Sequence, residues 1–279
     1  MTRSWRRWMA SVVLVAGMSW SGAASAQSLS ISPTRVVLEG RERSAELTLV
    51  NSSDQTLTYR VLFRRLAMSP TGQFQELSPE ASGKFVDAFV RYSPRQVTLG
   101  PGETQTVRLM VRAPASLGDG EYRSHLTFQA LPNATETPQA SNSEALEVEL
   151  KMRMSVSLPV IYRRGELGAE LKAPELQITQ HEGRPVAIVN LQRSGERSVY
   201  GDYELYYAPR QGLPAEFVGA VRGVAFYSPE QERVLRAPLS DDSVSAAGEW
   251  SLRFIARDGD QRAPAQPIAI ERVRRLSER

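Results

Sequence analysis

The chain has 279 residues, of which 34 are basic and 31 are acidic, and it contains no cysteine. Its length allows two domains of ordinary size, and its composition is that of a soluble globular protein rather than a disordered or fibrous one. Without cysteine, disulfide bonds, a lipid-modified cysteine and thiolate metal ligands are all excluded.

Residues 1–26 have the features of a secretory signal peptide. Three arginines near the start are followed by a mostly apolar stretch over residues 9–20, and Ala-Ser-Ala at residues 24–26 matches a signal-peptidase site. The alternative, a membrane anchor, fits less well because the apolar stretch is shorter than the roughly 20 residues that span a bilayer. We therefore expect a cleaved signal, a mature chain that starts at Gln27, and no stable membrane insertion.

Removal of this signal makes the chain formally neutral. The signal contains three of the 34 basic residues and no acidic residue, which leaves 31 basic against 31 acidic residues in the mature chain. The sequence pI of 9.3 is therefore no sign of a nucleic-acid-binding surface, which needs a basic stripe or cluster. We expect no nucleic acid as a partner.

Short runs of alternating apolar and polar residues, separated by turn residues, dominate the first half of the chain. Their close spacing predicts an antiparallel, immunoglobulin-like β-sandwich. Pro33 in the first run predicts an edge strand that breaks or switches partners, because proline cannot donate a hydrogen bond to a sheet. The expected strands cover residues 28–38, 45–50, 57–66, 85–92, 96–99, 106–111, 122–131 and 146–162.

The last of these runs, residues 146–162, is unusually long. One parity is apolar and the other is mostly polar, which predicts a strand with one buried face and one wet face. At about 3.3 Å per residue it spans roughly 50 Å, more than the core of one small sandwich covers. We therefore expect part of the apolar face to serve another chain. The apolar parity comprises Leu146, Val148, Leu150, Met152, Met154, Val156, Leu158, Val160 and Tyr162.

Strand patterns resume after Arg163-Arg164-Gly165 and predict a second, smaller β-sandwich. We therefore predict an all-β protein with two immunoglobulin-like β-sandwich domains after a cleaved signal peptide. Residues 27–164 form the expected N-terminal domain and residues 165–279 the expected C-terminal domain. The strands of the second domain are expected at residues 175–179, 185–191, 203–207, 218–226, 233–239, 250–256 and 268–273.

Four motifs in the first half occur together in one order. They are Ile-Ser-Pro-Thr-Arg-Val-Val at residues 31–37, Leu-Gly-Pro-Gly at 99–102 followed by Val-Arg-Leu at 107–109, Asp-Gly-Glu-Tyr-Arg-Ser-His-Leu at 119–126, and Ile-Tyr-Arg at 161–163. Over residues 28–165 this set resembles the N-terminal domain of the PapD-like periplasmic chaperones of the chaperone/usher pathway. Each motif is weak alone, and the second half of the chain carries no residues specific to that family.

The resemblance implies a periplasmic chaperone that lends its long alternating strand to pilus or fimbrial subunits that lack a strand, for assembly at an outer-membrane usher. The later part of the strand, residues 156–162, is expected to pack in its own core. An exposed strand edge would also favour self-association of the free protein. Aligned on the shared Tyr-Arg at the end of the strand, the donor residues would be Val148, Leu150, Met152 and Met154.

The resemblance also implies an anchor for the carboxylate at the C-terminus of the subunit. In the family an arginine of the first strand and a lysine of the last strand hold this group. Arg35 matches the arginine, and its planar guanidinium suits a carboxylate. Pro159 stands where the lysine is expected, and Arg163 is a nearby substitute. The alternative for Arg35 is an exposed charge at a strand edge.

Chemistry that would indicate an enzyme is absent from the sequence. His125 and His181 are the only histidines, and neither has an acid or a second histidine at metal-ligand spacing. No nucleophile elbow, phosphate loop or dinucleotide fingerprint appears. We therefore expect no enzymatic activity, no metal and no cofactor. A stand-alone secreted adhesive or structural protein is the main alternative, and an unrecognised hydrolase comes third.

Overall fold

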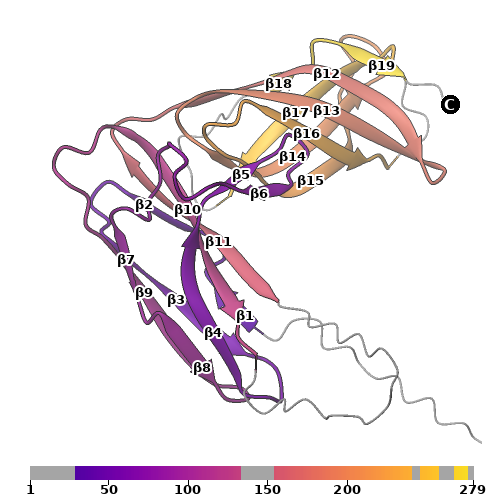
Figure 1. The fold of residues 1–279 in the computed structure, drawn as a ribbon. Coiled ribbons are helices and arrows are strands. Elements are labelled where there is room, and N and C mark those ends of the chain that lie inside the picture. The colour runs from indigo at the N-terminus through magenta and orange to yellow at the C-terminus, as the bar shows by residue number, and fades with distance from the viewer. Residues whose placement is uncertain (1–28, 133–153, 241–245, 258–266, 276–279) are drawn as a thin grey trace, which may run out of the picture.

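The computed structural model describes residues 29–132, 154–240, 246–257 and 267–275, and these residues form two β-sandwich domains (Figure 1). All regular elements within these ranges are strands, which confirms the predicted all-β class. None of the described segments forms a helix long and apolar enough to cross a membrane. The expected signal peptide lies outside the described residues.

The first domain packs two sheets face to face. One sheet has the order β1 (Leu29–Ser32), β3 (Ser44–Asn51), β9 (Thr104–Val111), β7 (Val90–Ser93). The other has the order β2 (Val36–Glu39), β11 (Ser155–Arg164), β10 (Gly120–Ala130), β4 (Leu57–Arg64), β8 (Gln96–Leu99). Because strand side chains alternate between faces, every second residue enters the shared core. That core includes Leu47, Leu49, Leu99, Val107, Leu126, Phe128 and Val160, all fully buried.

The chain changes sheets near Pro33, as its position in the sequence predicted. β1 pairs with β3 in the first sheet, whereas β2 pairs in parallel with β11 in the second sheet. Proline has no N–H to donate, so the ladder of hydrogen bonds ends there. The change of sheet brings Arg35, the residue before β2, next to Pro159 in the middle of β11.

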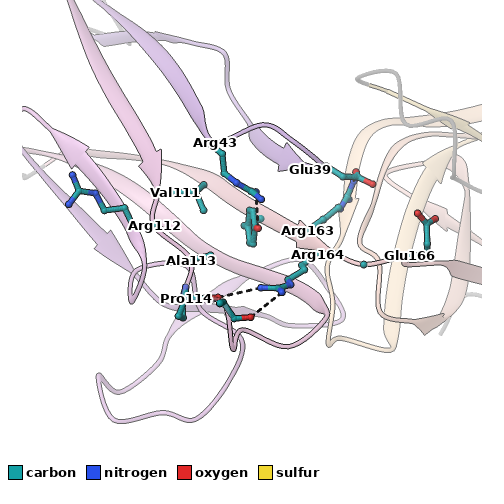
Figure 2. A pocket seen from close by; sticks show the side chains of 13 residues that line it. Glu39, Arg43, Val111, Arg112, Ala113, Pro114, Arg163, Arg164 and Glu166 are labelled. Atoms are coloured by element: carbon teal, nitrogen blue, oxygen red, sulfur yellow. Dashed lines mark hydrogen bonds and ion pairs between the residues drawn. The ribbon is translucent and has the colours of Figure 1, made fainter.

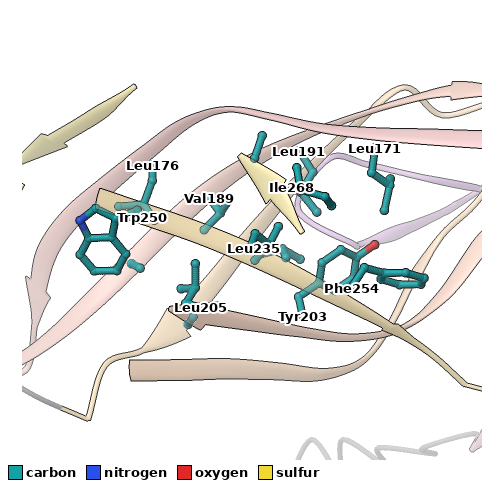
Figure 3. Packing of buried hydrophobic residues seen from close by; sticks show 14 of the residues in the cluster. Leu171, Leu176, Val189, Leu191, Tyr203, Leu205, Leu235, Trp250, Phe254 and Ile268 are labelled. Atoms are coloured by element: carbon teal, nitrogen blue, oxygen red, sulfur yellow. The ribbon is translucent and has the colours of Figure 1, made fainter. Parts of the chain in front are cut away.

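The second domain also contains two sheets around one core (Figure 3). The first sheet has the order β16 (Glu232–Pro238), β13 (Arg184–Gly195), β12 (Ala169–His181), β19 (Val273–Arg275). The second has the order β15 (Glu216–Phe226), β14 (Val199–Ala208), β17 (Glu249–Ala256), β18 (Ile268–Ala269). Within the described residues the two domains share no strand, and the numerical boundary at residues 164 and 165 stays a prediction. Figure 3 shows the core side chains, which include Leu176, Val189, Leu191, Tyr203, Leu205, Leu235, Trp250 and Phe254.

A short hairpin of the first domain, which the sequence patterns above did not predict, reaches the second domain (Figure 1). It consists of β5 (Leu66–Met68) and β6 (Phe74–Glu76). The carbonyl oxygen of Pro70 in its turn accepts hydrogen bonds from the backbone N–H of Val234 at 2.8 Å and from Nη1 of Arg233 at 3.0 Å. The hairpin therefore ties the two domains together.

The prediction of a strand at residues 85–92 is wrong for the first half of this range. β7 begins only at Val90, and the N–H groups of Phe89 and Val90 both donate to the carbonyl oxygen of Val86, which makes residues 86–90 a turn. The apolar residues Val86, Phe89 and Val90 are three and four positions apart, so one helical turn brings them to the same side. All three are buried in the core.

Candidate functional site

The N-terminal half of β11 forms an edge of its sheet. β11 pairs with β10 along its whole length, but β2 covers its other side only at residues 160–163. Within the described residues, residues 155–159 therefore have a neighbouring strand on one side alone. Figure 1 shows this half of β11 pointing away from the second domain. An unpaired edge exposes N–H and C=O groups that can bind another strand.

The side chains on the apolar face of β11 become less buried toward this edge. Leu158, Val160 and Tyr162 are buried, Val156 is half-buried, and Met154 is 50% exposed. This gradient agrees with the expectation that the later part of the strand packs in its own domain. The other predicted donor residues, Val148, Leu150 and Met152, lie outside the described residues. Their role, and that of Met154, stays a prediction.

The opposite face of β11 differs from the sequence prediction at its C-terminal end. The polar parity was expected to be wet, yet Ile161 is fully buried and Arg163 is only 4% exposed. The reason is that the hairpin and the second domain cover this face together, because Ile161 packs with Met68 of the hairpin and with Tyr227 of the second domain. The apolar residue at position 161 was the one sequence signal of this contact.

Arg35, the predicted anchor, is half-buried at the junction of the two domains. Its guanidinium carbon lies 5.0 Å from the ring centroid of Tyr200 and 5.5 Å from that of Tyr227. Arg35 also makes a side-chain hydrogen bond to Tyr227. Cation–π contacts of this kind hold a guanidinium in place. The alternative of an isolated exposed charge therefore does not describe Arg35.

Arg163, the second predicted anchor residue, takes part in a buried ionic network between the domains. Its Nε donates to Oε2 of Glu121 at 2.8 Å, and its Nη2 donates to the carbonyl oxygen of Ser198 at 3.0 Å. Its Nη1 lies 3.4 Å from Oε2 of Glu39, which also accepts from Arg197 at 3.1 Å. Burial alone would raise the pKa of Glu39, but hydrogen bonds and charges from Arg197 and Arg163 hold it below its usual range.

Arg35 and Arg163 do not converge on one point. The register of β2 with β11 places Arg35 next to Pro159 and places Arg163 beside Glu39. The two arginines lie on the same face of the sheet but are four residues apart, about 13 Å along the strands. The donor groups of Arg163 are engaged by Glu121, Glu39 and the carbonyl oxygen of Ser198. The role of either arginine as an anchor stays a prediction.

His125 occupies the sheet position next to Pro159 and is enclosed by the second domain. Its ring centroid lies 4.9 Å from that of Phe74 and 6.0 Å from that of Tyr227. Neither ring nitrogen has a hydrogen-bond partner among the described residues. Burial, followed by the charges of Arg123 and Arg35, lowers the pKa of His125 from its ordinary 6.5 to about 3. With this pKa, His125 is neutral near pH 7.

A cavity of about 530 Å³ lies at the C-terminal end of β11, with Arg43, Arg163 and Arg164 among its lining residues (Figure 2). Arg43 donates to the hydroxyl of Tyr162 at 2.9 Å, and Arg164 donates to two backbone carbonyl oxygens at 3.2 and 3.3 Å. Each of these guanidinium groups is engaged by the chain itself. The cavity lies at the opposite end of β11 from residues 155–159, so it does not extend the strand edge.

Within the described residues no group of three or more histidine, aspartate or glutamate side chains could hold a metal ion. His181 is exposed. The residues that the sequence reasoning missed are the partners of Arg35 from the second domain, Tyr200 and Tyr227. Tyrosines in strands are common, and only the spatial contact between the domains sets these two apart.

Comparisons with known proteins identify the family of the first domain. Residues 28–163 match the family described as pili and flagellar-assembly chaperone, PapD N-terminal domain, which confirms the predicted resemblance. No curated protein matches the chain. The family consists of assembly chaperones rather than enzymes, in agreement with the predicted lack of enzymatic activity.

Solved structures of fimbrial chaperones are similar at low identity. The class 5 fimbriae chaperone CfaA has a TM-score of 0.47 at 14% identity, covering 87% of this chain and 98% of that chain. The YadV chaperone has a TM-score of 0.46 at 15% identity, covering 88% and 100%. A chaperone–tip adhesion subunit complex from Acinetobacter baumannii, CsuC–CsuE, has a TM-score of 0.41 at 12% identity, covering 90% and 100%. Over residues 28–163, the chain belongs to the PapD N-terminal domain family of pili and flagellar-assembly chaperones.

Proposed function

We propose that the chain is a periplasmic chaperone that holds pilus or fimbrial subunits by strand addition at β11. The observation that carries this proposal is the edge at residues 155–159, which has a neighbouring strand on one side alone among the described residues and begins beside the exposed Met154. A client segment in extended form gains backbone hydrogen bonds at such an edge, and alternate side chains of the edge strand fill pockets of the client. Subunits passed on in this way would go to an outer-membrane usher.

The donor side chains in this proposal are Val148, Leu150, Met152 and Met154, which share one parity of the sequence. Burial of one such side chain contributes about 1.5–3 kcal/mol. Four of them would contribute roughly 6–12 kcal/mol before the cost of ordering both partners is subtracted. This is enough for a complex that must later be released.

Met152→Glu tests the donor strand most directly, because the new carboxylate would enter an apolar pocket of the client without a partner. We expect the yield of co-purified client to fall more than about tenfold, while the thermal unfolding of the free chaperone stays unchanged. Lys151→Gln is the matched control, since it changes the net charge by the same amount on the other parity. Unfolding of free Met152→Glu would instead place Met152 in the core and contradict the proposal.

Arg35 is the proposed anchor for the C-terminal carboxylate of the client. Its support is the matched position and the half-buried place over two tyrosine rings. We expect Arg35→Ala to lower client yield and Arg35→Lys to retain part of it, because lysine keeps the charge but not the planar fork. Arg41→Ala, at an exposed position of the same domain, is the control. Equal client yield from Arg35→Ala and Arg41→Ala would show that Arg35 does not anchor the client.

The partners and the location are tested by purifying the tagged chain from the periplasmic fraction and identifying the proteins bound to it. Small β-rich proteins that lack a strand are the expected clients. A chain that stays cytoplasmic contradicts the proposed location. A chain purified alone, from cells that produce pili, would favour a stand-alone adhesive or structural protein.

A further inference from the structure

A second cavity, of about 660 Å³, lies between the two domains. Leu66, Leu77 and Phe85 of the first domain and Pro229 of the second contribute apolar walls. Small-molecule sites have about this size, lie preferentially at domain interfaces, and are mostly apolar with a few polar groups. The cavity is separate from the strand edge, because it borders β10 and the hairpin rather than residues 155–159.

The cavity contains a buried charged pair that is only partly satisfied. Arg123 is 8% exposed, and its Nη2 donates to Oε1 of Glu230 at 3.0 Å. Nε and Nη1 of Arg123 and Oε2 of Glu230 have no hydrogen-bond partner among the described residues. Buried polar atoms are normally satisfied, so unpaired ones at a cavity indicate a missing partner. Two unpaired donors stand against one unpaired acceptor, which favours a partner that accepts hydrogen bonds.

We propose that this inter-domain cavity binds a small amphipathic anion, with its apolar body against Leu77 and Phe85 and its carboxylate or sulfonate near Arg123. A guanidinium recognises such an oxyanion with two donors at once. The wall also includes the Lys84–Glu196 ion pair, at 2.7 Å, whose side chains are 45% and 59% exposed. An exposed pair of this kind separates easily and gives a ligand access. Because both domains line the cavity, bound ligand stabilises their arrangement.

The first test titrates the mature protein with 1-anilinonaphthalene-8-sulfonate, an aromatic sulfonate whose fluorescence rises in apolar sites. We expect saturable binding at one site and displacement by decanoate. Decylamine, which has the same apolar body and the opposite charge, should not displace the probe. A lack of saturable binding, or equal displacement by decanoate and decylamine, would overturn the assignment.

The second test places the probe in this cavity rather than on another apolar surface. Arg123→Gln is the obvious variant but removes a buried ion-pair partner, so the decisive variant is Ser82→Trp, at an exposed residue of the cavity wall. We expect the tryptophan to fill the cavity and raise the Kd for the probe at least about tenfold. Gln105→Trp, at an exposed position on β9, is the matched control. Equal affinity of the two tryptophan variants would overturn the proposal.

Discussion

The two halves of β11 have the same alternating sequence but opposite surroundings. At residues 160–163 the strand has β10 on one side and β2 on the other, and both of its faces are buried. At residues 155–159 the described part of the chain provides β10 as the only neighbouring strand, and Ser155 and Ser157 are exposed. A period of two therefore identifies which face meets the core of the strand's own domain. What covers the other face and the free edge depends on residues far away in the sequence.

The largest expected effect concerns the ionic network on the C-terminal half of β11. Glu121→Ala would leave Arg163 buried beside fewer carboxylates, and removal of one partner of a buried pair costs about 3–5 kcal/mol. We expect a loss of this size in the free energy of unfolding, measured by urea denaturation. Glu46→Ala is the control, because Glu46 and Arg108 form an exposed pair at 2.9 Å. Such a pair contributes less than about 1 kcal/mol, so equal losses would show that the network does not stabilise the junction.

A second comparison tests the outer face of the two halves of β11. Ile161→Ala removes apolar atoms from a fully buried site between the domains and should destabilise the protein by about 2–5 kcal/mol. Ser155→Ala, on the same face at the exposed end, should change the stability by less than about 0.5 kcal/mol. Thermal unfolding of both variants measures the difference. If Ile161→Ala unfolds at the same temperature as the unchanged protein, position 161 is not buried between the domains. The sequence prediction of a solvent-exposed face would then be correct.

An effect that is smaller per pH unit should appear as a pH dependence of stability that originates at His125. In the unfolded chain this histidine binds a proton below pH 6.5, whereas in the folded chain its pKa is about 3. The unfolded state therefore binds more protons between these values, so stability is full above pH 6.5 and is lost as the pH falls toward 3. The slope reaches at most about 1.4 kcal/mol per pH unit.

His125→Phe should flatten this part of the profile, because phenylalanine keeps the ring contacts with Phe74 and Tyr227 without a titratable group. The measurement is urea denaturation of both proteins between about pH 7 and about pH 4, a window in which the carboxylates of both proteins titrate alike. Parallel curves for the two proteins would mean that His125 is accessible to protons in the folded state.

The sequence predicted those features that contacts within one domain determine. Pro33 marked the change of sheet, and the run at residues 122–131 became β10 almost residue for residue. It failed where another domain supplies the contact, because nothing near Arg163 or Arg123 in the chain indicates that their charges are buried. The hairpin β5–β6 left a signal that could have been recognised, since Pro70, Thr71 and Gly72 separate two short alternating runs.

For the candidate site, the sequence provided the strand, the parity and Arg35, but not the geometry. The alternating pattern and the family resemblance predict the donor residues without a fold, and their role stays a prediction; they are Val148, Leu150, Met152 and Met154. That Arg163 is engaged, and that Arg35 lies over Tyr200 and Tyr227, depends on how the second domain meets the first. A local sequence pattern does not specify how one domain contacts another.

The contact between Pro70 and Val234 also limits how copies of the chain can join. β16 is an edge strand of its sheet, and the N–H of Val234 in its middle is occupied by the carbonyl oxygen of Pro70. If residues 155–159 of one molecule paired with β16 of the next, the contact would join two different surfaces head to tail and would extend without closing. By occupying this N–H, the hairpin works against such open-ended polymers, while among the described residues no second strand covers the edge of β11 at 155–159.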